Sequence, residues 1–234
     1  MFYNNMDAKR NYFIALVPMK GHSERVKNKN RREIGGKPLF WYILNTLTHC
    51  RNIGKICVDT DDTLIEEEVL KYFSNVEIIN RPENLRGDFV SMNDIIEYDI
   101  SVTDGEYYLQ THSTNPLLEP ETIDRAIDLF IENSMESDSL FSVNRMQTRL
   151  YDKNGNPLNH DPDKLIRTQD LDPIYEENSN IYIFTRKGFA DTGKRIGRKP
   201  LMYEMNPLEA VDIDDENDFL LAQALLGNRQ EETV

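Results

Sequence analysis

The stretch Tyr12–Asn30 reads YFIALVPMKGHSERVKNKN and joins a short apolar run to a basic loop. Its first six residues are continuously apolar and have the length of a buried strand. The loop that follows holds one glycine and several cations, and it matches neither GxGxxG nor GxxxxGK[ST]. Lysine and arginine side chains with free backbone N–H groups can nevertheless surround a triphosphate. The stretch therefore indicates either a phosphate-binding loop after a strand or a solvated basic turn.

Apolar segments alternate with amphipathic helical segments along the rest of the chain. Strands are predicted at residues 12–17, 56–58, 76–79, 107–109, 140–143 and 181–184. Helices are predicted to begin at Pro38, after the acidic turn 59–62, near Ser91, at Pro120 and at Asp214/Asp215, and the last is predicted to stop at Gly227. In the acidic turn, Asp61 is predicted to cap the following helix. The alternation predicts an α/β fold with a mainly parallel sheet covered on both faces.

The length of 234 residues is that of one domain, so residues 1–234 are assigned to a single unit. Residues 145–177 break the rhythm with four glycine and proline residues, and we interpret them as an excursion from the core. No apolar run approaches the roughly 20 residues of a membrane span, and the first residues lack the layout of a signal peptide. Cys50 and Cys57 are predicted to be reduced, buried thiols. These features predict a cytoplasmic protein without membrane segments.

The charge is divided unevenly along the chain. The first 40 residues hold nine basic and three acidic residues, although the whole chain carries a net charge of −14. A mostly acidic protein is a poor non-specific binder of nucleic acid, because phosphate neutralisation needs a broad positive surface. A local basic cluster instead suits a small polyphosphate such as a nucleoside triphosphate.

Near the other end of the chain, the segment Glu209–Asp214 alternates apolar and acidic residues. In an extended segment, Asp212 and Asp214 share one side while Val211 and Ile213 face the core. Two carboxylates on one side repel each other unless a positive group lies between them. Mg²⁺ is the natural candidate, because it binds one or two carboxylates together with substrate phosphates and water. The alternative is that Asp214 only caps the last helix and Asp212 is a turn residue.

Seven segments occur in an order that resembles the acylneuraminate cytidylyltransferase family, the synthetases that make CMP-sialic acid and other CMP-nonulosonic acids. They are VPMKGHSERVKNKN, GGKPLF, VDTDD, INRPENL, LQTHSTNPLL, ENSNIYIF and VDIDDENDFLLAQ. The likeness covers about Ile14 to Ala224. It implies a Rossmann-like three-layer α/β/α nucleotidyltransferase, usually a homodimer, that uses CTP and Mg²⁺ to convert an acidic 3-deoxy-2-keto sugar into a CMP-sugar and pyrophosphate. The excursion would then serve dimerisation or the acceptor pocket.

The resemblance also implies roles for residues that match the family motifs. Those implied for the nucleotide and its phosphates are Lys20, Gly21, Lys29, Asn30, Arg81 and Ser91. Those implied for the acidic sugar are Gln110, Arg167, Asn178 and Tyr182. Asp212 and Asp214 match the metal-binding aspartates, and Lys20, Lys29 and Asp212 are the residues implied in the transfer step.

Two departures concern the acceptor sugar. The family commonly has Gln-Pro-Thr-Ser-Pro-Leu-Arg, whereas residues 110–118 are two residues longer and end without the arginine. His112, within this segment, is predicted either to contact the substrate or to bond neighbouring backbone. The identity of the sugar is therefore left open. Alternatives are transfer to a sugar 1-phosphate, use of another nucleotide, or a non-catalytic nucleotide-binding module.

Overall fold

The computed structural model describes residues 13–23 and 25–231. Its main sheet has seven strands in the order β5-β4-β1-β6-β8-β7-β9, and a small hairpin pairs β2 with β3. Only β8 runs antiparallel to its neighbours in the main sheet. Tyr12 and Glu24, and the basic residues Lys9 and Arg10, lie outside the described residues.

The strands are β1 Phe13–Met19, β2 Glu33–Ile34, β3 Lys37–Pro38, β4 Ile53–Thr60, β5 Glu77–Asn80, β6 Tyr107–Gln110, β7 Ser139–Met146, β8 Ile174–Thr185 and β9 Pro200–Glu204. The α-helices are α1 Leu39–His49, α2 Thr63–Tyr72, α3 Met92–Val102, α4 Pro120–Glu132, α5 Arg186–Thr192 and α6 Glu216–Glu231. Short 3₁₀ turns occupy Lys29–Arg31, Glu83–Leu85 and Thr168–Asp170.

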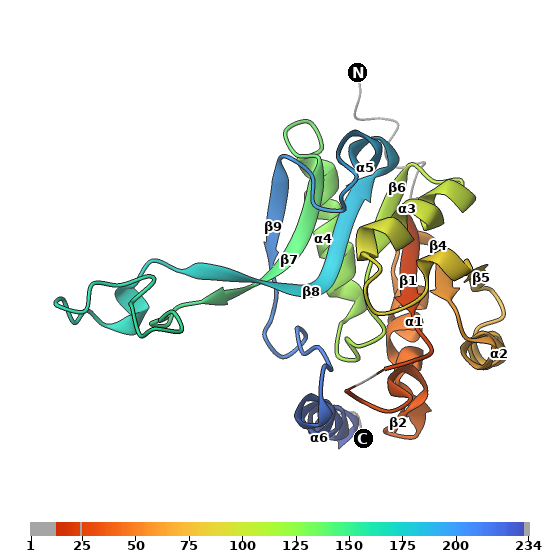
Figure 1. Ribbon diagram of the computed structural model, residues 1–234, viewed down its shortest axis with the longest axis horizontal. Coiled ribbons are helices and arrows are strands. Elements are labelled where there is room, and N and C mark those ends of the chain that lie inside the picture. The colour runs from red at the N-terminus through yellow and green to blue at the C-terminus, as the bar shows by residue number, and fades with distance from the viewer. Residues whose placement is uncertain (1–12, 24, 232–234) are drawn as a thin grey trace.

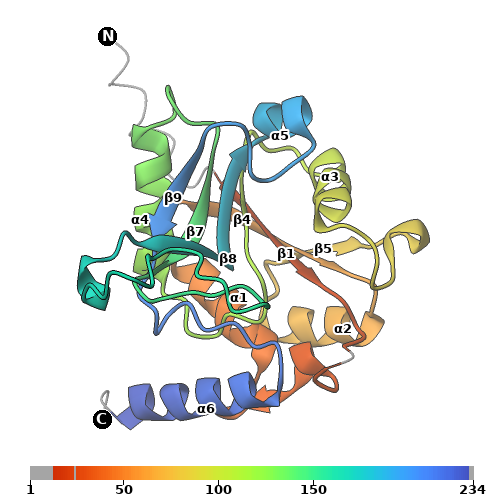
Figure 2. The same cartoon turned by 60° about the vertical axis from the view of Figure 1, so that its left-hand side comes forward.

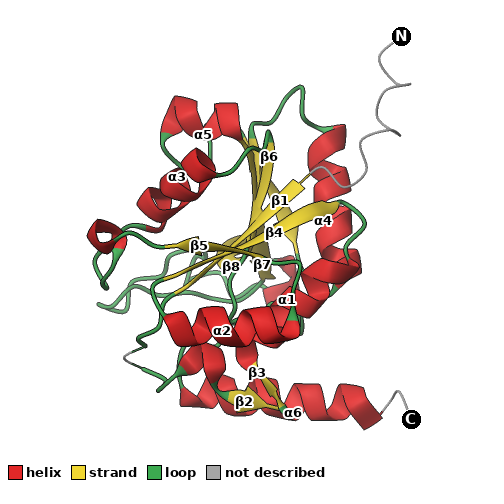
Figure 3. Ribbon diagram, turned by 90° about the vertical axis from the view of Figure 1, so that its right-hand side faces the viewer, coloured by secondary structure: helices red, strands yellow, loops and turns green. Residues whose placement is uncertain are grey.

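Helices cover both faces of the sheet, because successive side chains of a central strand point to opposite faces. In β1, Ala15 and Val17 pack in one cluster with apolar residues of α1, α2 and α4. Ile14 and Leu16 belong to a second cluster on the other face, with residues of α3 and α5. Figure 3 shows these helices on the two sides of the strands. The predicted three-layer arrangement is confirmed.

Helix α6 lies beyond the sheet and packs near the start of α1 (Figure 2). Phe219, Ala222 and Leu226 of this helix form a third apolar cluster with Ile34 and other residues. The same cluster contains Ile213, so the segment that carries Asp212 and Asp214 is fixed to the core beside its two acidic residues.

The hairpin of β7 and β8 continues beyond the sheet as a long arm (Figure 1). Pairing runs from Ser139 opposite Phe184 to Met146 opposite Ile174, with an irregularity between Phe141 and Val143. The predicted excursion at 145–177 corresponds to this arm, although the structure begins and ends it within paired strands.

Several boundaries differ from those predicted from the sequence. Pro38 is the N-cap of α1 in extended conformation and not its first helical residue. Helix α6 continues past Gly227 to Glu231, since nothing in that last turn forces a left-handed cap. Asp62 caps α2 by accepting from the backbone N–H of Leu64, so the prediction that Asp61 caps this helix is wrong.

Candidate active site

A cavity of about 320 Å³ opens at the carboxyl ends of the parallel strands. Strands β4 and β5 follow on one side of β1 and β6 lies on the other, so the strand order reverses between β1 and β6. Open α/β sheets bind ligands outside such a reversal point. The polar and charged lining residues include Lys20, Ser23, Lys29, Asn30, Arg81, Asp88, His112, Ser113, Thr114, Ser179, Arg195, Asp212 and Asp214.

Lys29, Asp212 and Asp214 meet in this cavity from the two ends of the chain. Lys29 Nζ donates to the carbonyl oxygen of Ile213 at 2.7 Å and lies 3.6 Å from Asp214 Oδ1. Asp212 and Asp214 both line the cavity, whereas Ile213 between them is fully buried in the core. The alternation predicted from the sequence is confirmed, and it directs both carboxylates toward the same space.

Lys20 also lines the cavity, and its Nζ lies 2.5 Å from Asp88 Oδ1. Gly21 is placed differently from the phosphate-binding role that the sequence implied. Its N–H donates to Asp61 Oδ1 at 2.7 Å, so this donor is already used within the protein. A Cβ at Gly21 would lie 2.6 Å from the Cβ of Asp62, and glycine is therefore required where the first loop meets the start of α2.

Asn30 and Arg81 are buried residues of the cavity wall. Asn30 Nδ2 donates to the carbonyl oxygen of Lys20 at 2.8 Å, and Asn30 Oδ1 accepts from Ser113 Oγ at 2.6 Å. Arg81 forms an ion pair with Asp59, and both side chains are almost fully buried. These contacts fix the shape of the wall.

Ser91 is the N-cap of α3, where its hydroxyl accepts from the N–H of Asn93 at 3.2 Å. Its neighbours Val90 and Met92 line the cavity. The structure therefore places Ser91 next to the cavity wall with a hydrogen bond to its own helix.

The arrangement fits a magnesium ion. Asp212 Oδ1 is buried without a hydrogen-bond partner among the described residues. Burial raises the pKa of Asp212, and the neighbouring charge of Asp214 raises it further. A divalent cation would bind this oxygen and offset the repulsion. No group of three or more His, Cys, Asp or Glu gathers for a metal within residues 13–23 and 25–231. Two carboxylates are the protein ligand set that Mg²⁺ takes when phosphates and water complete its shell.

The residues predicted for the sugar divide into two groups. Gln110 and Tyr182 lie beside the cavity and both contact Arg195, since Gln110 Oε1 accepts from Arg195 Nη1 and the Tyr182 ring stacks under its guanidinium. Asn178 instead holds the irregular part of the β7–β8 pairing: its Oδ1 accepts from Ser142 Oγ and its Nδ2 donates to Asn144 Oδ1. Its neighbour Ser179, with φ of 57°, lines the cavity.

Arg167 is not brought to the cavity. It lies on the arm, where its side chain is exposed and pairs with Asp170. Besides Arg81, the cavity is lined by Arg195, which lies in the loop between α5 and β9. Sequence reasoning missed Arg195 because the loop has no local pattern, and the only available signal was its position shortly after a strand already assigned to the acceptor side.

His112 also lines the cavity. Burial, together with the nearby charges of Arg195 and Lys29, lowers the pKa of His112 to about 3, so the imidazole is neutral near pH 7. Its Nε2 lies 3.1 Å from Gln110 Nε2. The amide nitrogen is a donor, so His112 Nε2 accepts and the ring proton resides on Nδ1. The prediction had left substrate contact and backbone bonding open, and the structure shows a side-chain contact with Gln110.

Most of the basic cluster is paired with acids far away in the chain. Arg25 pairs with Asp214, Arg31 with Glu68, and Arg32 with Glu216. Of the described lysines and arginines in the first 40 residues, Lys20 and Lys29 line the cavity. The cluster therefore joins the first loop to α2 and α6 as well as supplying charge to the site.

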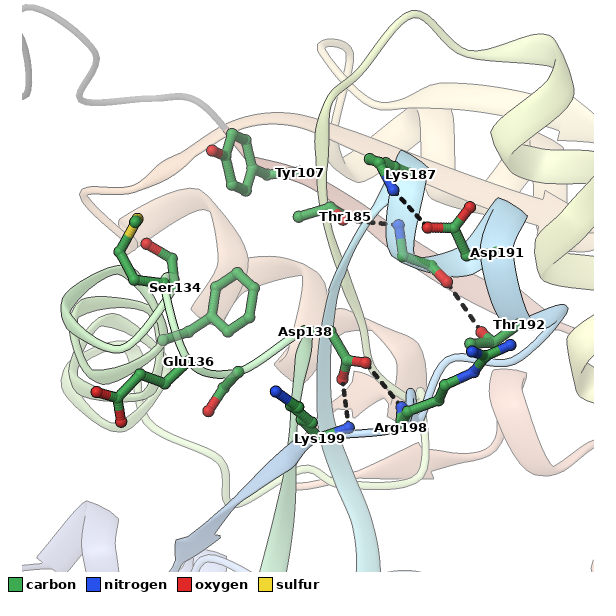
Figure 4. Close-up of a pocket in the computed structure, with 14 residues that line it drawn as sticks. Tyr107, Ser134, Glu136, Asp138, Thr185, Lys187, Asp191, Thr192, Arg198 and Lys199 are labelled. Carbon is green, nitrogen blue, oxygen red and sulfur yellow. Dashed lines mark hydrogen bonds and ion pairs between the residues drawn. The ribbon is translucent and has the colours of Figure 1, made fainter.

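A second pocket of about 550 Å³ lies at the other end of the strands, and Figure 4 shows the residues that line it. Tyr107, Asp138 and Thr185 mark the amino ends of the parallel strands there. Asp138 accepts from the backbone N–H groups of Arg198 and Lys199, as the dashed lines in Figure 4 show. Since its carboxylate is engaged by the protein and the pocket faces away from the strand ends that bind ligands, we retain the first cavity as the candidate site.

None of the helices formed by the described part of the chain combines the length and the apolar character needed to cross a bilayer.

The chain is similar to proteins of known function. A sequence profile described as cytidylyltransferase matches residues 14–229. N-acylneuraminate cytidylyltransferase A of Danio rerio is 27% identical over 222 residues, which cover 92% of this chain and 51% of that protein. The CMP-N,N'-diacetyllegionaminic acid synthase of Legionella pneumophila is 29% identical, with 94% of this chain and 99% of that protein covered. This chain thus spans about half the length of the fish relative.

Among solved structures, a CMP:2-keto-3-deoxy-manno-octonic acid synthetase complexed with CTP superposes with a TM-score of 0.69 at 13% identity, covering 93% of this chain and 99% of that chain. At this identity the likeness establishes the α/β fold.

Proposed function

Because this chain belongs to the cytidylyltransferase family, we propose that it couples CTP with an acidic 3-deoxy-2-keto sugar of the nonulosonic acid type, giving a CMP-sugar and pyrophosphate. Relatives named as N-acylneuraminate, pseudaminic acid and legionaminic acid enzymes support this substrate class. The observation that carries the proposal is the meeting of Lys20, Lys29, Asp212 and Asp214 in one cavity at the reversal point of the sheet.

Mg²⁺ is proposed as the metal of this site, held by Asp212 and Asp214. When bound, it would neutralise phosphate charge and polarise the oxygens that it contacts. The buried oxygen of Asp212 that lacks a partner among the described residues supports this assignment.

The transfer step needs positioning and charge compensation more than covalent help from the protein. The anomeric hydroxyl oxygen of the sugar forms a bond to the α-phosphorus of CTP. The bond from that phosphorus to the oxygen bridging the β-phosphate breaks, and pyrophosphate leaves with the electron pair. We assign Lys20 and Lys29 to the phosphate charges and Asp212 to accepting the hydroxyl proton.

We assign Gln110 and Tyr182 to the binding of the acceptor sugar. Asn30 and Arg81 form the cavity wall on the nucleotide side. Ser91 and Asn178 act through the elements that they hold, α3 and the β7–β8 pairing. Gly21 contributes by letting the first loop approach the start of α2 closely.

The arm is proposed to form the interface of a homodimer. Its exposed apolar side chains support this role: Leu165 is 87% exposed and Leu158 is 64% exposed. A second copy of the chain would cover them and bring Arg167 to a partner's site. Size-exclusion chromatography with light scattering tests the proposal, with Leu165→Glu expected to yield monomers and a monomeric parent chain counting against it.

The protein is proposed to act in the cytoplasm. Cys50 and Cys57 are both free and buried, as predicted. Burial raises the pKa of Cys57 to about 12, so this thiol stays protonated and unreactive. Such thiols are compatible with a reducing compartment.

A screen of pyrophosphate release tests the function. The chain is incubated with Mg²⁺, CTP and a panel of nonulosonic and other 3-deoxy-2-keto acids, with ATP, GTP and UTP and with sugar 1-phosphates in parallel. Release with CTP and at least one keto acid is expected. CTP binding that does not depend on Mg²⁺, with no pyrophosphate from any acid, would instead identify a non-catalytic nucleotide-binding module.

A further inference from the structure

We propose that Arg195 is the receptor for the carboxylate of the acceptor sugar and selects acidic over neutral sugars. This inference rests on the proposed function. Arg195 lies in the loop between α5 and β9, and it lines the same cavity as Lys20 and Asp212.

Arg195 forms no close ion pair within the described part of the chain, although the charge of Glu177 acts on it from a greater distance. The other cations of the cavity wall are each paired: Lys20 with Asp88, Lys29 with Asp214, and Arg81 with Asp59. No ion pair joins Arg195 to a carboxylate of residues 13–23 or 25–231. Burial lowers the pKa of Arg195, while the nearby Tyr182 and Glu177 oppose this effect. A partly buried cation without a contacting anion is costly, and a ligand that brings an anion lowers this cost.

The orientation of Arg195 is fixed before any ligand binds. Its guanidinium carbon lies 3.7 Å from the centroid of the Tyr182 ring, and its Nη1 donates to Gln110 Oε1. Its backbone N–H donates to Asn93 Oδ1 at 3.3 Å. Among the described residues, neither Nε nor Nη2 has a hydrogen-bond partner. Nε and Nη2 form one edge of the guanidinium, and these two donors can bind both oxygens of a carboxylate.

The groups around Arg195 add no second full positive charge on the acceptor side. His112 is neutral near pH 7 and Gln110 is uncharged. Gln110 Nε2 donates to the carbonyl oxygen of Thr111 at 2.9 Å, so the amide oxygen stays directed at the guanidinium. The charged group near Arg195, Glu177, is held by the Tyr182 hydroxyl and is negative. A single cation matches a singly charged carboxylate better than a phosphate, and Lys20 and Lys29 are the cations assigned to the triphosphate.

The experiment compares Arg195→Gln with the parent chain on matched ligands. Each keto acid that releases pyrophosphate with CTP is assayed beside its methyl ester, which keeps the sugar and loses the charge. The parent chain is expected to prefer the acid by at least about 30-fold in kcat/KM. Arg195→Gln is expected to lose most of that preference, because its reaction with the acid becomes slower and its reaction with the ester does not. CTP binding, measured by calorimetry, should be unchanged.

Arg198→Gln is the matched control. It makes the same substitution three residues away, on an exposed side chain that lines the second pocket (Figure 4), and it should keep the preference. Arg195→Lys retains the charge without the planar pair of donors and should show an intermediate preference. Retention of the acid-over-ester preference by folded Arg195→Gln would overturn the assignment.

The failure of the proposed function has a different signature. In that case the parent chain releases no pyrophosphate with CTP and any acid. Arg195 is then tested by ligand-observed NMR with N-acetylneuraminic acid and its methyl ester at equal concentration in the presence of CTP. Binding of the acid that Arg195→Gln abolishes would support the carboxylate receptor even so, and equal binding of the acid and the ester, or of neither, would refute it.

Discussion

Lys29 Nζ donates a hydrogen bond to the carbonyl oxygen of Ile213 although 184 residues separate them in the chain. The bond joins the basic loop after β1 to the segment that carries Asp212 and Asp214. The side chain of Ile213 is buried among apolar residues of α6, so this segment is fixed both by its backbone bond to Lys29 and by its packing against the helix. Lys29 thus holds the two segments together and also places its positive charge beside Asp212 and Asp214 in the cavity.

Replacing Lys29 by methionine should lower kcat/KM for CTP by about 100-fold, because a cation that compensates phosphate charge is lost. The hydrogen bond to Ile213 is lost as well, which should cost about 1 kcal/mol in the free energy of unfolding. Steady-state kinetics and urea unfolding measure the two effects. Lys27→Met is the control, since Lys27 is exposed and does not line the cavity. Equal effects of the two variants on kcat/KM would contradict the placement of Lys29.

Asp212→Ala and Asp214→Ala should each lower turnover by roughly three orders of magnitude while the fold is kept. Removing either charge relieves repulsion between the two carboxylates, and the ion pair that Asp214 forms with Arg25 is exposed and contributes little, so the melting temperature should change little. Pyrophosphate release and thermal unfolding are the measurements, and titration with Mg²⁺ should show weaker saturation in both variants. Asp172→Ala, an exposed position at the base of the arm, serves as the control. Near-normal turnover in either variant would remove the metal assignment.

Asp88→Asn should tighten the binding of CTP by roughly three- to tenfold. The carboxylate of Asp88 now occupies Lys20, and the hydrogen bond from Lys20 lowers the pKa of Asp88, so Asp88 is ionised near pH 7 and competes with phosphate. The exposure of both side chains keeps the expected gain small. Calorimetry at low and high salt measures it. Asp104→Asn removes the same charge at the other end of the sheet and should have no effect; weaker binding by Asp88→Asn would show that Asp88 assists the nucleotide.

Asp99→Asn should stabilise the protein above neutral pH. Burial and, to a smaller extent, the adjacent carboxyl of Asp59 together raise the pKa of Asp99 to about 9 in the fold, while Arg81 opposes both. In the unfolded chain this carboxyl loses its proton near its ordinary value of 3.8. Between these values the folded state holds a proton that the unfolded state has lost, so this group lowers stability as pH rises, by at most about 1.4 kcal/mol per pH unit.

Urea unfolding at pH 6.0 and pH 8.5 measures this dependence. The parent chain should lose stability over that interval, and Asp99→Asn, which keeps a hydrogen-bond donor toward Asp59 and cannot ionise, should lose much less. Asp163→Asn on the exposed arm should behave like the parent chain. Identical pH dependence in the parent and in Asp99→Asn would show that the pKa of Asp99 is not raised in the fold.

The sequence was sufficient for the layered fold because its strands are short apolar runs and its helices are amphipathic. It was also sufficient for the acidic pair, since Asp212, Ile213 and Asp214 alternate and Ile213 has an obvious place in the core. It placed the basic loop in the site, although only Lys20 and Lys29 of its described cations line the cavity. The rest of that cluster pairs with acids such as Glu68 and Glu216, and those partners depend on tertiary contacts that spacing does not encode.

The acceptor side was harder to predict for a physical reason. Arg167 and Arg195 are both followed by short, irregular segments, and nothing in their neighbours distinguishes them. The structure separates them because β8 returns from the arm into the sheet, which leaves Arg167 outside, and the α5–β9 loop then crosses back to place Arg195 over Tyr182. Likewise Gly21 looked like a phosphate donor in the loop, but its N–H meets Asp61, a partner 40 residues away.

The position of β8 also has a consequence for synthesis on the ribosome. Strand β8 pairs with β6 on one side and β7 on the other, yet it is translated after both of them. A nascent chain that has emerged as far as α4 can pair β5, β4, β1 and β6, and the free side of β6 then presents unsatisfied backbone groups to solvent. That exposed edge is closed only when the second half of the hairpin has left the exit tunnel, so this interval is when the chain is most open to aggregation and most dependent on chaperones.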